Sequence, residues 1–345
     1  MNTSEDKERL ENQRRLIQES GLQICGTFVP VCHEEELLAR MAACGMNAMR
    51  LNTNHCTLEE AVDWIEAWKK ACKYTDVDGR LLVDLQKGSL RTDLTEPVFL
   101  ESQNRVDAYA LGLPEAVYEE MRAGDILLLD DGRIRLEVLE EGSCLIQEGG
   151  LLENHKNVCL ENRDLERPSL SGQDLQTLRD AKKYGVSALM IPFVEGAADL
   201  QQVRKLVDRY CPGVRILAKI ETARGVEQIE EILPWCDEIV MARGDLGNDV
   251  GLAMLPAACE RIRKACLVAG KPWMVVTQML DSMIEHPKPT RAEVSDIFYA
   301  VALGAGSIML TNETAAGKYP LEAMETFCSV ACSALEQKEE LTCAV

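Results

Sequence analysis

The fold of this chain is read most directly from the stretch Val214-Arg215-Ile216-Leu217-Ala218-Lys219-Ile220-Glu221, an apolar run that closes on a lysine and a glutamate. A second apolar run, Ile239-Val240-Met241-Ala242, closes in the same way on Arg243-Gly244-Asp245. Alternate residues of a strand share one face, so Lys219 and Glu221 are expected to point into one site. Two carboxylates and an ammonium group at strand ends suit a divalent metal that holds an anionic oxygen substrate. Either motif alone favours a surface salt bridge, but their repetition at consecutive strand ends favours a shared site.

Apolar runs of this kind recur along the chain and alternate with amphipathic stretches. We expect strands at residues 22–28, 46–51, 81–84, 187–191, 214–220, 238–242, 273–276 and 307–310. Helices are expected between them, at residues 34–43, 57–71, 171–184, 198–210, 256–269, 291–303 and 321–335. Eight strands that alternate with helices favour an α/β fold of the (β/α)8 TIM-barrel type. An open doubly wound sheet is the alternative.

Residues 92–167 break this alternation. An apolar run at 126–129, the pair Asp131-Gly132 and an alternating run at 134–136 predict a β-hairpin. We therefore expect a small β-rich domain at 92–167, inserted after the third strand, and a barrel built from residues 1–91 and 168–345. An insertion at that place lies at the active-site end of a barrel, where it can act as a lid.

Composition narrows the class of protein. Of the 345 residues 46% are hydrophobic, enough for a large core, and the net charge of −20 disfavours nucleic acid and anionic membranes as partners. The 14 cysteines are irregularly spaced without a Cys-x-x-Cys pair, which indicates buried reduced thiols. No signal peptide and no apolar run of membrane-spanning length is present, so we expect a cytoplasmic protein.

Polar residues cluster at the carboxyl ends of the predicted strands, where barrel enzymes place their chemistry. The clusters are Arg50, Asn52, Asn54 and His55; Asp84, Gln86 and Lys87; Lys219 and Glu221; Asp245; Thr277 and Gln278; and Thr311, Asn312 and Glu313. Surface loops are commonly polar whether or not they form a site. The recurrence of polar clusters at many strand ends is therefore stronger evidence for an active site than any single cluster. Thr290 and Glu293 have the spacing of a helix cap and are given a structural role.

Several of these stretches, taken in order, resemble the pyruvate kinase family. They are Met46-Asn47-Ala48-Met49-Arg50-Leu51-Asn52, Ala218-Lys219-Ile220-Glu221, Ala242-Arg243-Gly244-Asp245-Leu246-Gly247, Thr277-Gln278-Met279-Leu280, Pro289-Thr290-Arg291-Ala292-Glu293 and Glu313-Thr314-Ala315-Ala316-Gly317-Lys318-Tyr319-Pro320. The resemblance runs from about Leu22 to about Thr326. It implies a barrel with an inserted β-domain that closes over the site, and the glycolytic transfer of a phosphoryl group from phosphoenolpyruvate to ADP, giving pyruvate and ATP.

The resemblance also implies roles for individual residues. Glu221 and Asp245 match ligands of Mg²⁺ or Mn²⁺, and Lys219 matches the lysine that stabilises charge on the moving phosphoryl group. Arg50 matches a phosphate contact, Thr277 a residue beside the enolate, and Gly244 a backbone contact to the substrate carboxylate. Positions for a monovalent cation, K⁺ in the family, are matched by Asn52, Asn54, Asp84 and the Leu85 carbonyl. Nucleotide-contacting positions are matched by Asn52, His55, Arg91 and Lys156.

Departures from the family pattern leave alternatives open. Asn54 replaces a serine, and Ser89 stands near a glutamate linked to potassium dependence, so dependence on K⁺ is left open. Gln86-Lys87 replaces part of a Thr-Lys-Gly motif, and Pro192 and Glu195 replace a serine and an arginine. A metal-dependent lyase or aldolase acting on pyruvate-like oxoacids is one alternative, although Arg50, His55 and Arg91 argue against it; a non-catalytic metabolite-binding protein is another. The family's C-terminal domain does not follow the barrel, so effector control is not expected, and a homo-oligomer is compatible with the sequence.

Overall fold

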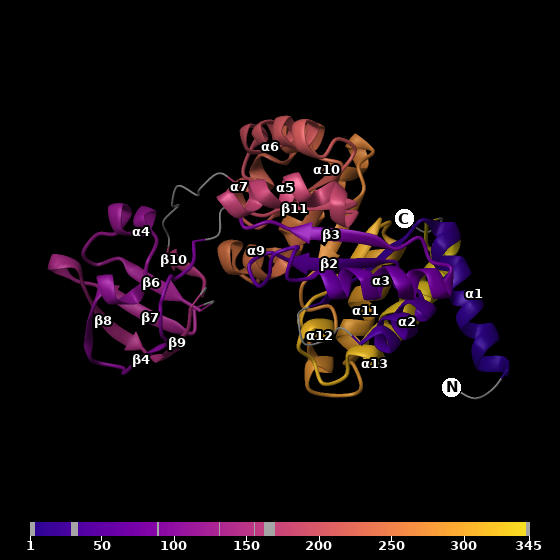
Figure 1. Ribbon diagram of the computed structural model, residues 1–345, viewed down its shortest axis with the longest axis horizontal. Coiled ribbons are helices and arrows are strands. Elements are labelled where there is room, and N and C mark those ends of the chain that lie inside the picture. The colour runs from indigo at the N-terminus through magenta and orange to yellow at the C-terminus, as the bar shows by residue number, and fades with distance from the viewer. Residues whose placement is uncertain are drawn as a thin grey trace. The chain divides into compact units, whose positions relative to one another are not determined.

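The computed structural model describes residues 4–28, 34–87, 90–130, 132–154, 156–161 and 170–342. Ser89 and Asp131 lie outside these ranges. The chain divides into two compact units (Figure 1). Unit 1 comprises Met1–Leu85 and Gly172–Val345, and unit 2 comprises Gln86–Ser171.

Unit 1 is a closed barrel of parallel strands. In barrel order the strands are β1 (Gln23–Phe28), β15 (Ser307–Leu310), β14 (Trp273–Val276), β13 (Glu238–Ala242), β12 (Arg215–Ile220), β11 (Ala188–Ile191), β3 (Arg80–Asp84) and β2 (Ala48–Asn52). The barrel closes because β1 pairs with β15 on one side and with β2 on the other. The predicted (β/α)8 barrel is therefore confirmed, and the open doubly wound sheet is wrong.

Helices precede, connect and follow the strands of the barrel, several of them visible around β2, β3 and β11 in Figure 1. They are α1 (Ser4–Ser20), α2 (Glu35–Cys44), α3 (Val62–Thr75), α5 (Gly172–Tyr184), α6 (Ala197–Tyr210), α7 (Ala223–Glu227), α8 (Ile229–Ile232), α9 (Arg243–Val250), α10 (Leu255–Ala269), α11 (Arg291–Ala302), α12 (Asn312–Ala315) and α13 (Pro320–Thr342). The 3-10 turns η3 (Leu233–Trp235) and η4 (Asp281–Ile284) complete the connections. At α11 the predicted cap is confirmed, because Thr290 and Glu293 form a reciprocal capping box.

Small and flexible side chains fill the barrel interior. The buried cluster comprises Cys25, Ala48, Leu82, Ala188, Met190, Leu217, Val240, Ala242, Met274, Val276 and Met309. Such packing makes the interior a solid core, as in other barrels of this type, and not a pore. The polar groups at the carboxyl ends of the strands therefore lie above an apolar, water-excluding floor.

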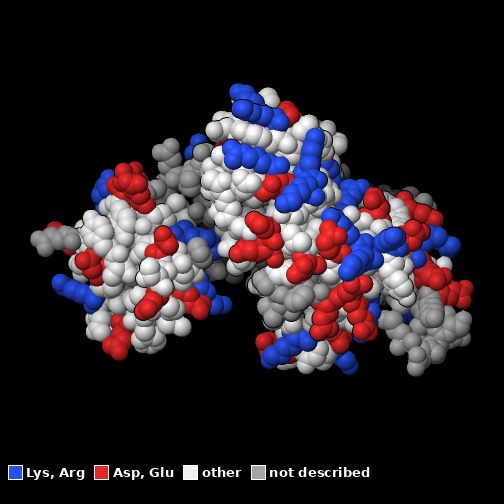
Figure 2. All heavy atoms as spheres, viewed as in Figure 1, with Lys and Arg blue, Asp and Glu red and all other residues white. Residues whose placement is uncertain are grey.

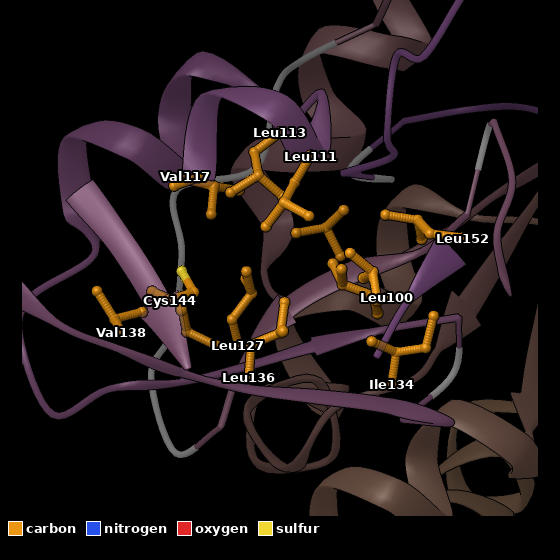
Figure 3. Packing of buried hydrophobic residues seen from close by; sticks show 14 of the residues in the cluster. Leu100, Leu111, Leu113, Val117, Leu127, Ile134, Leu136, Val138, Cys144 and Leu152 are labelled. Atoms are coloured by element: carbon orange, nitrogen blue, oxygen red, sulfur yellow. The ribbon is translucent and has the colours of Figure 1, made fainter. Parts of the chain in front are cut away.

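Unit 2 has its own β-structure and its own core. An antiparallel sheet has the order β10 (Val158–Leu160), β6 (Ile126–Leu129), β7 (Ile134–Val138), β8 (Ser143–Glu148) and β5 (Arg105–Asp107). Strands β4 (Val98–Leu100) and β9 (Gly150–Leu152) form a second pair, and the unit also contains η1 (Ala108–Leu111), η2 (Glu140–Gly142) and α4 (Glu115–Glu120). The predicted hairpin is confirmed by the antiparallel pairing of β6 with β7. Leucine, isoleucine and valine side chains of these strands, of η1 and of α4 point toward one another in Figure 3.

The structure shows the environment of the cysteines. Each cysteine in the described ranges is a free thiol and most are buried, which confirms the expectation of reduced thiols for these positions. Burial raises the pKa of Cys44 to about 12 and that of Cys56 to about 11, so the reactive thiolate is disfavoured.

Figure 2 shows acidic side chains in clusters on the visible face of each unit, with basic side chains between them. Within the described residues, no helix combines the length and the apolar character needed to cross a membrane.

We expect Leu136→Ala to destabilise unit 2. Leu136 is fully buried, so the truncation removes apolar contacts and leaves a cavity, at a cost of about 2–5 kcal/mol. Leu151→Ala is the matched control: it also lies on a strand of unit 2, but its side chain is 53% exposed, so a change of about 0.5 kcal/mol or less is expected. Hydrogen exchange of the unit 2 amides measures both. Equal protection in the two variants contradicts this description of the core.

Candidate active site

The polar residues named in the sequence arrive at the carboxyl ends of the barrel strands. Arg50 and Asn52 lie at the end of β2, with Asn54 and His55 in the loop that follows. Asp84 ends β3, and Leu85 comes directly after it. Lys219 lies in β12, and Glu221 follows the strand. Gly244 and Asp245 lie in the first turn of α9, and Thr277 follows β14.

Asp84 connects two cationic side chains at this end of the barrel. Its Oδ2 atom accepts hydrogen bonds from Arg50 Nη2 at 2.5 Å and Arg50 Nε at 3.1 Å. The same oxygen lies 3.2 Å from Lys219 Nζ. Arg50 also donates from Nη1 to Thr27 Oγ1 at 3.2 Å. Three strands, β2, β3 and β12, are thus linked through one carboxylate that is only 2% exposed.

Glu221 is fixed on both sides. Its Oε1 lies 3.0 Å from Lys219 Nζ, and its Oε2 accepts a hydrogen bond from the backbone N–H of Phe193 at 2.6 Å. Phe193 reaches this position with a φ of 48°, an uncommon left-handed conformation for an aromatic residue. Pro192 and Glu195 lie in the same loop, where the N–H of Glu195 donates to Asp199 Oδ2 at 3.0 Å. The loop after β11 therefore orients the carboxylate that directly follows the neighbouring strand, β12.

The electrostatics keep these groups charged. Burial raises the pKa of Asp84, but the charges of Lys219 and Arg50 outweigh it and hold that pKa below its usual value. Burial lowers the pKa of Lys219, but Asp84 and Glu221 outweigh it, with a smaller contribution from Asp245, so that pKa lies above its usual value. The ammonium group therefore persists in a buried site, where its field on an anion is strong.

Gly244 and Thr277 approach each other closely. A Cβ atom added at Gly244 would lie 2.9 Å from Thr277 Cγ2, so a larger residue would displace the threonine. Thr277 itself has a φ of 74°, which is a genuine outlier for a β-branched residue. Asp245 lies next to Gly244 and contributes to the field at Lys219. The first turn of α9 and the end of β14 thus face one another beside the charged cluster.

The four positions matched to a monovalent cation lie around the ends of β2 and β3. Asn52 is the register partner of Asp84. Asn52 Oδ1 accepts hydrogen bonds from the backbone N–H and from Nδ2 of Asn54, at 3.0 and 3.1 Å. Asp84 Oδ1 is buried and has no hydrogen-bond partner among the described residues, although Oδ2 of the same group has several. A buried carboxylate oxygen of this kind fits a bound cation, which would compensate it.

The four positions matched to a nucleotide are divided between the units. Asn52 and the exposed His55 belong to unit 1, whereas Arg91 and Lys156 belong to unit 2. Lys156 Nζ lies 3.1 Å from Asp130 Oδ1 and 3.1 Å from Glu153 Oε2. Arg91 forms an isolated antiparallel bridge with Asn157. These contacts order the two cationic residues within unit 2.

The donor set is also compatible with a divalent metal. Mg²⁺ prefers oxygen ligands and is commonly held by one or two carboxylates together with substrate oxygens and water. Glu221 and Asp245 supply two such carboxylates. No group of three or more His, Cys, Asp or Glu residues arranged as a complete metal site occurs in the described residues. A metal at Glu221 and Asp245 would therefore need oxygens from a substrate or from water.

Two contributors to this site carried no interpretable signal in the sequence. The backbone N–H of Phe193 contacts Glu221 because the loop after β11 turns through a left-handed residue, and a phenylalanine does not predict that conformation. Thr27, on β1, contacts Arg50 across the sheet, although its surroundings in the sequence are those of an ordinary strand. Asp84 could be recognised as a site residue from its place at a strand end, but its pairing with both Arg50 and Lys219 is visible only in the structure.

Comparisons with known proteins agree with the geometry. A family profile described as "Pyruvate kinase, barrel domain" matches residues 100–324. A pyruvate kinase of Staphylococcus aureus (strain MRSA252) is 33% identical over 334 residues, which cover 90% of this chain and 56% of that protein. A pyruvate kinase of Mycobacterium intracellulare is 33% identical over 332 residues, covering 91% of this chain and 70% of that protein. The chain thus spans a little more than half the length of the first relative.

We expect Asp84→Asn to lower the pKa of Lys219, because burial then acts without its principal opposing charge. Titration of the lysine side chains by NMR, with ¹³C at Cε, measures the shift.

The same substitution should have a pH-dependent effect on stability. The pKa of Asp84 is lower in the folded state than in the unfolded state, so its ionised carboxylate contributes fully to stability above the unfolded pKa. That contribution is lost as the pH falls through the folded pKa. The destabilisation caused by Asp84→Asn is therefore greatest near neutral pH and declines in acid.

Glu238→Gln is the control for this titration. Glu238 is also a buried carboxylate, 1% exposed, but it begins β13 at the opposite end of the barrel and pairs with Arg215 at 2.8 Å. Its substitution should leave the Lys219 resonance in place. An unchanged Lys219 pKa in Asp84→Asn contradicts the electrostatic account of the site.

Proposed function

The chain belongs to the pyruvate kinase family, and we propose that it transfers a phosphoryl group between phosphoenolpyruvate and ADP, giving pyruvate and ATP. The observation that supports this most directly is the cluster of Arg50, Asp84, Lys219 and Glu221 at the carboxyl end of the barrel strands. Glycolysis is the setting that this reaction implies, and a cytoplasmic location follows from that setting.

We assign the two cations to charge neutralisation. Phosphoryl transfer requires little covalent chemistry from the protein, so catalysis depends on positioning and on stabilising the charge of the moving group. Lys219 is proposed to contact the transferred phosphoryl oxygens, and Arg50 the phosphate of the substrate. Asp84 holds both side chains through one oxygen, which limits their movement before substrate arrives.

Glu221 and Asp245 are proposed to hold Mg²⁺ or Mn²⁺. The ion would supply Lewis-acid stabilisation to the anionic oxygens of the substrate. With three carboxylates and two cationic side chains, the cluster of Arg50, Asp84, Lys219, Glu221 and Asp245 has a formal charge of minus one. A divalent ion held there would change that formal charge to plus one, so that an acidic site could bind an anionic substrate.

Gly244 and Thr277 are proposed to bind the three-carbon part of the substrate. The Thr277 side chain approaches Gly244 so closely that a side chain at position 244 would displace it. Gly244 lies in the first turn of α9, where backbone N–H groups have no carbonyl partner within the helix and can donate to a carboxylate. The Thr277 hydroxyl is proposed to lie beside the enolate carbon, where Oγ1 orients the proton that this carbon receives.

We propose that Asn52, His55, Arg91 and Lys156 each contribute to nucleotide binding. The support is the match of these positions to the family pattern and the chemistry of the side chains, since cationic donors suit a diphosphate. Single substitutions of each residue test the assignment individually: an increased KM for ADP at constant KM for phosphoenolpyruvate is the expected result.

The proposed activity is tested by coupling pyruvate production to lactate dehydrogenase in the presence of ADP, phosphoenolpyruvate and Mg²⁺. Lys219→Ala should reduce kcat by about 10²-fold or more, because it removes a preorganised charge from the transition state. Lys264→Ala is the control, since Lys264 is a largely exposed lysine of α10 that pairs with Glu260. A wild-type rate no greater than that of Lys219→Ala contradicts the proposal. If oxalate and Mg²⁺ bind but ADP does not, the result favours a lyase or aldolase. If all the ligands bind without turnover, the result favours a non-catalytic metabolite-binding protein.

We further propose that Asn52, Asn54, Asp84 and the Leu85 carbonyl bind a monovalent cation such as K⁺. The supporting observation is Asp84 Oδ1, which is buried and receives no hydrogen bond from the described residues. Replacing K⁺ by tetramethylammonium at constant ionic strength should lower kcat in the wild type, because the larger ion cannot enter the site. Asn54→Ala should reduce this difference, whereas Lys264→Ala, at the largely exposed lysine of α10, should retain it. Equal rates in both salts exclude a functional cation at these residues.

A further inference from the structure

The backbone immediately after β14 is held in an unusual conformation. Thr277 and Gln278 have φ values of 74° and 54°, so two consecutive non-glycine residues adopt the left-handed conformation. For a β-branched residue this conformation is unfavourable, and it persists only where surrounding contacts impose it. The residues that impose it therefore determine where the Thr277 hydroxyl lies.

Arg243 supplies the contacts on one side of this turn. Its Nη2 donates to the Thr277 carbonyl oxygen at 2.9 Å and lies 2.9 Å from Met279 Sδ. Its Nη1 donates to Asp296 Oδ2, on α11, at 2.7 Å. The Arg243 side chain is only 18% exposed, so these interactions are partly shielded from water. The planar fork fixes the carbonyl and the carboxylate in one geometry, which a lysine could not reproduce.

The position of Arg243 in the sequence gives this contact its significance. Arg243 is the first residue of α9 and directly precedes Gly244 and Asp245. One side chain therefore connects the turn that carries Asp245 with the turn that carries Thr277. Glu313 contacts the same segment further along the chain, where its Oε1 accepts a hydrogen bond from the Leu280 N–H at 3.1 Å.

We propose that Arg243, oriented by Asp296, is a positioning residue that holds Thr277 in its left-handed conformation and so sets the Thr277 hydroxyl for catalysis. This inference rests on the proposed function for its catalytic consequence. The effect of Arg243 on the Thr277 backbone is supported by the hydrogen bond between them and does not depend on the proposed function. Arg243 acts through the carbonyl of Thr277 and needs no contact with the substrate.

The test compares Arg243→Met, Asp296→Asn and a matched control, Arg204→Met. Arg204 makes the same pair of interactions elsewhere on unit 1, with Asp237 Oδ2 at 2.8 Å and with the Trp235 carbonyl at 3.4 Å. Misplacing a reacting group by about 1 Å can cost about 10²-fold in rate, so Arg243→Met should lower kcat/KM for phosphoenolpyruvate by about 10- to 100-fold. Asp296→Asn keeps the guanidinium and should have a smaller effect in the same direction, and Arg204→Met should have none.

Two further measurements separate positioning from a general structural role. The Thr277 methyl resonance, assigned with Thr277→Ser, should move in Arg243→Met and in Asp296→Asn but not in Arg204→Met. Gln278→Gly should restore part of the lost rate in the Arg243→Met background, because glycine adopts positive φ without a steric cost. An unmoved Thr277 methyl in both Arg243→Met and Asp296→Asn overturns the inference, as does a wild-type kcat/KM in Arg243→Met.

The methyl readout does not require turnover. A wild-type protein without kinase activity whose Thr277 methyl responds to Arg243→Met contradicts the proposed function and supports the positioning role. An active wild type whose Thr277 methyl is indifferent to Arg243 and Asp296 supports the function and contradicts the positioning role. If Arg243→Met does not fold, Asp296→Asn provides the same comparison with the arginine in place.

Discussion

Two like charges, those of Arg50 and Lys219, are brought together at the end of the barrel by the carboxylate of Asp84. The field of Arg50 alone would lower the pKa of Lys219, and burial acts in the same direction. Asp84, with Glu221, reverses both effects and keeps the ammonium group charged. A buried charge without a partner is costly, so the cluster is stable only as a set. Every other element of the site is arranged around this set.

The barrel supplies the conditions in which such a set is useful. Parallel strands bring residues that are far apart in the chain to one edge: Arg50, Asp84 and Lys219 come from β2, β3 and β12. The interior below them is filled with alanine, methionine, leucine and valine side chains. Water cannot approach from that direction, and electrostatic interactions are therefore stronger than at an open surface. The loops after β11 and β14 complete the site with oriented backbone groups.

The strands could be predicted because each is a short apolar run whose length and spacing follow from a buried parallel sheet. Lys219 and Glu221 could be paired from the sequence alone, because residues two apart in an extended segment share one face. The contact between Asp84 and Lys219 could not be predicted in this way, because it depends on the register between strands that are distant in sequence. Nor could the turns at Phe193 and Thr277, since neither residue type favours a positive φ. Their conformation is set by tertiary contacts.

The interruption of the barrel by unit 2 has a consequence for how the chain folds. β3 pairs with β11, and β1 with β15, so the sheet cannot be completed until the last strand has left the ribosome. Unit 2 is continuous in sequence and has its own core, so it can fold earlier, as domains commonly do during synthesis. Its first and last residues, Gln86 and Ser171, are joined by a hydrogen bond of 3.3 Å. The folded insertion therefore acts as a short tether between β3 and α5, the helix that leads into β11, and lowers the loop-closure entropy that an unfolded connection would impose on the barrel.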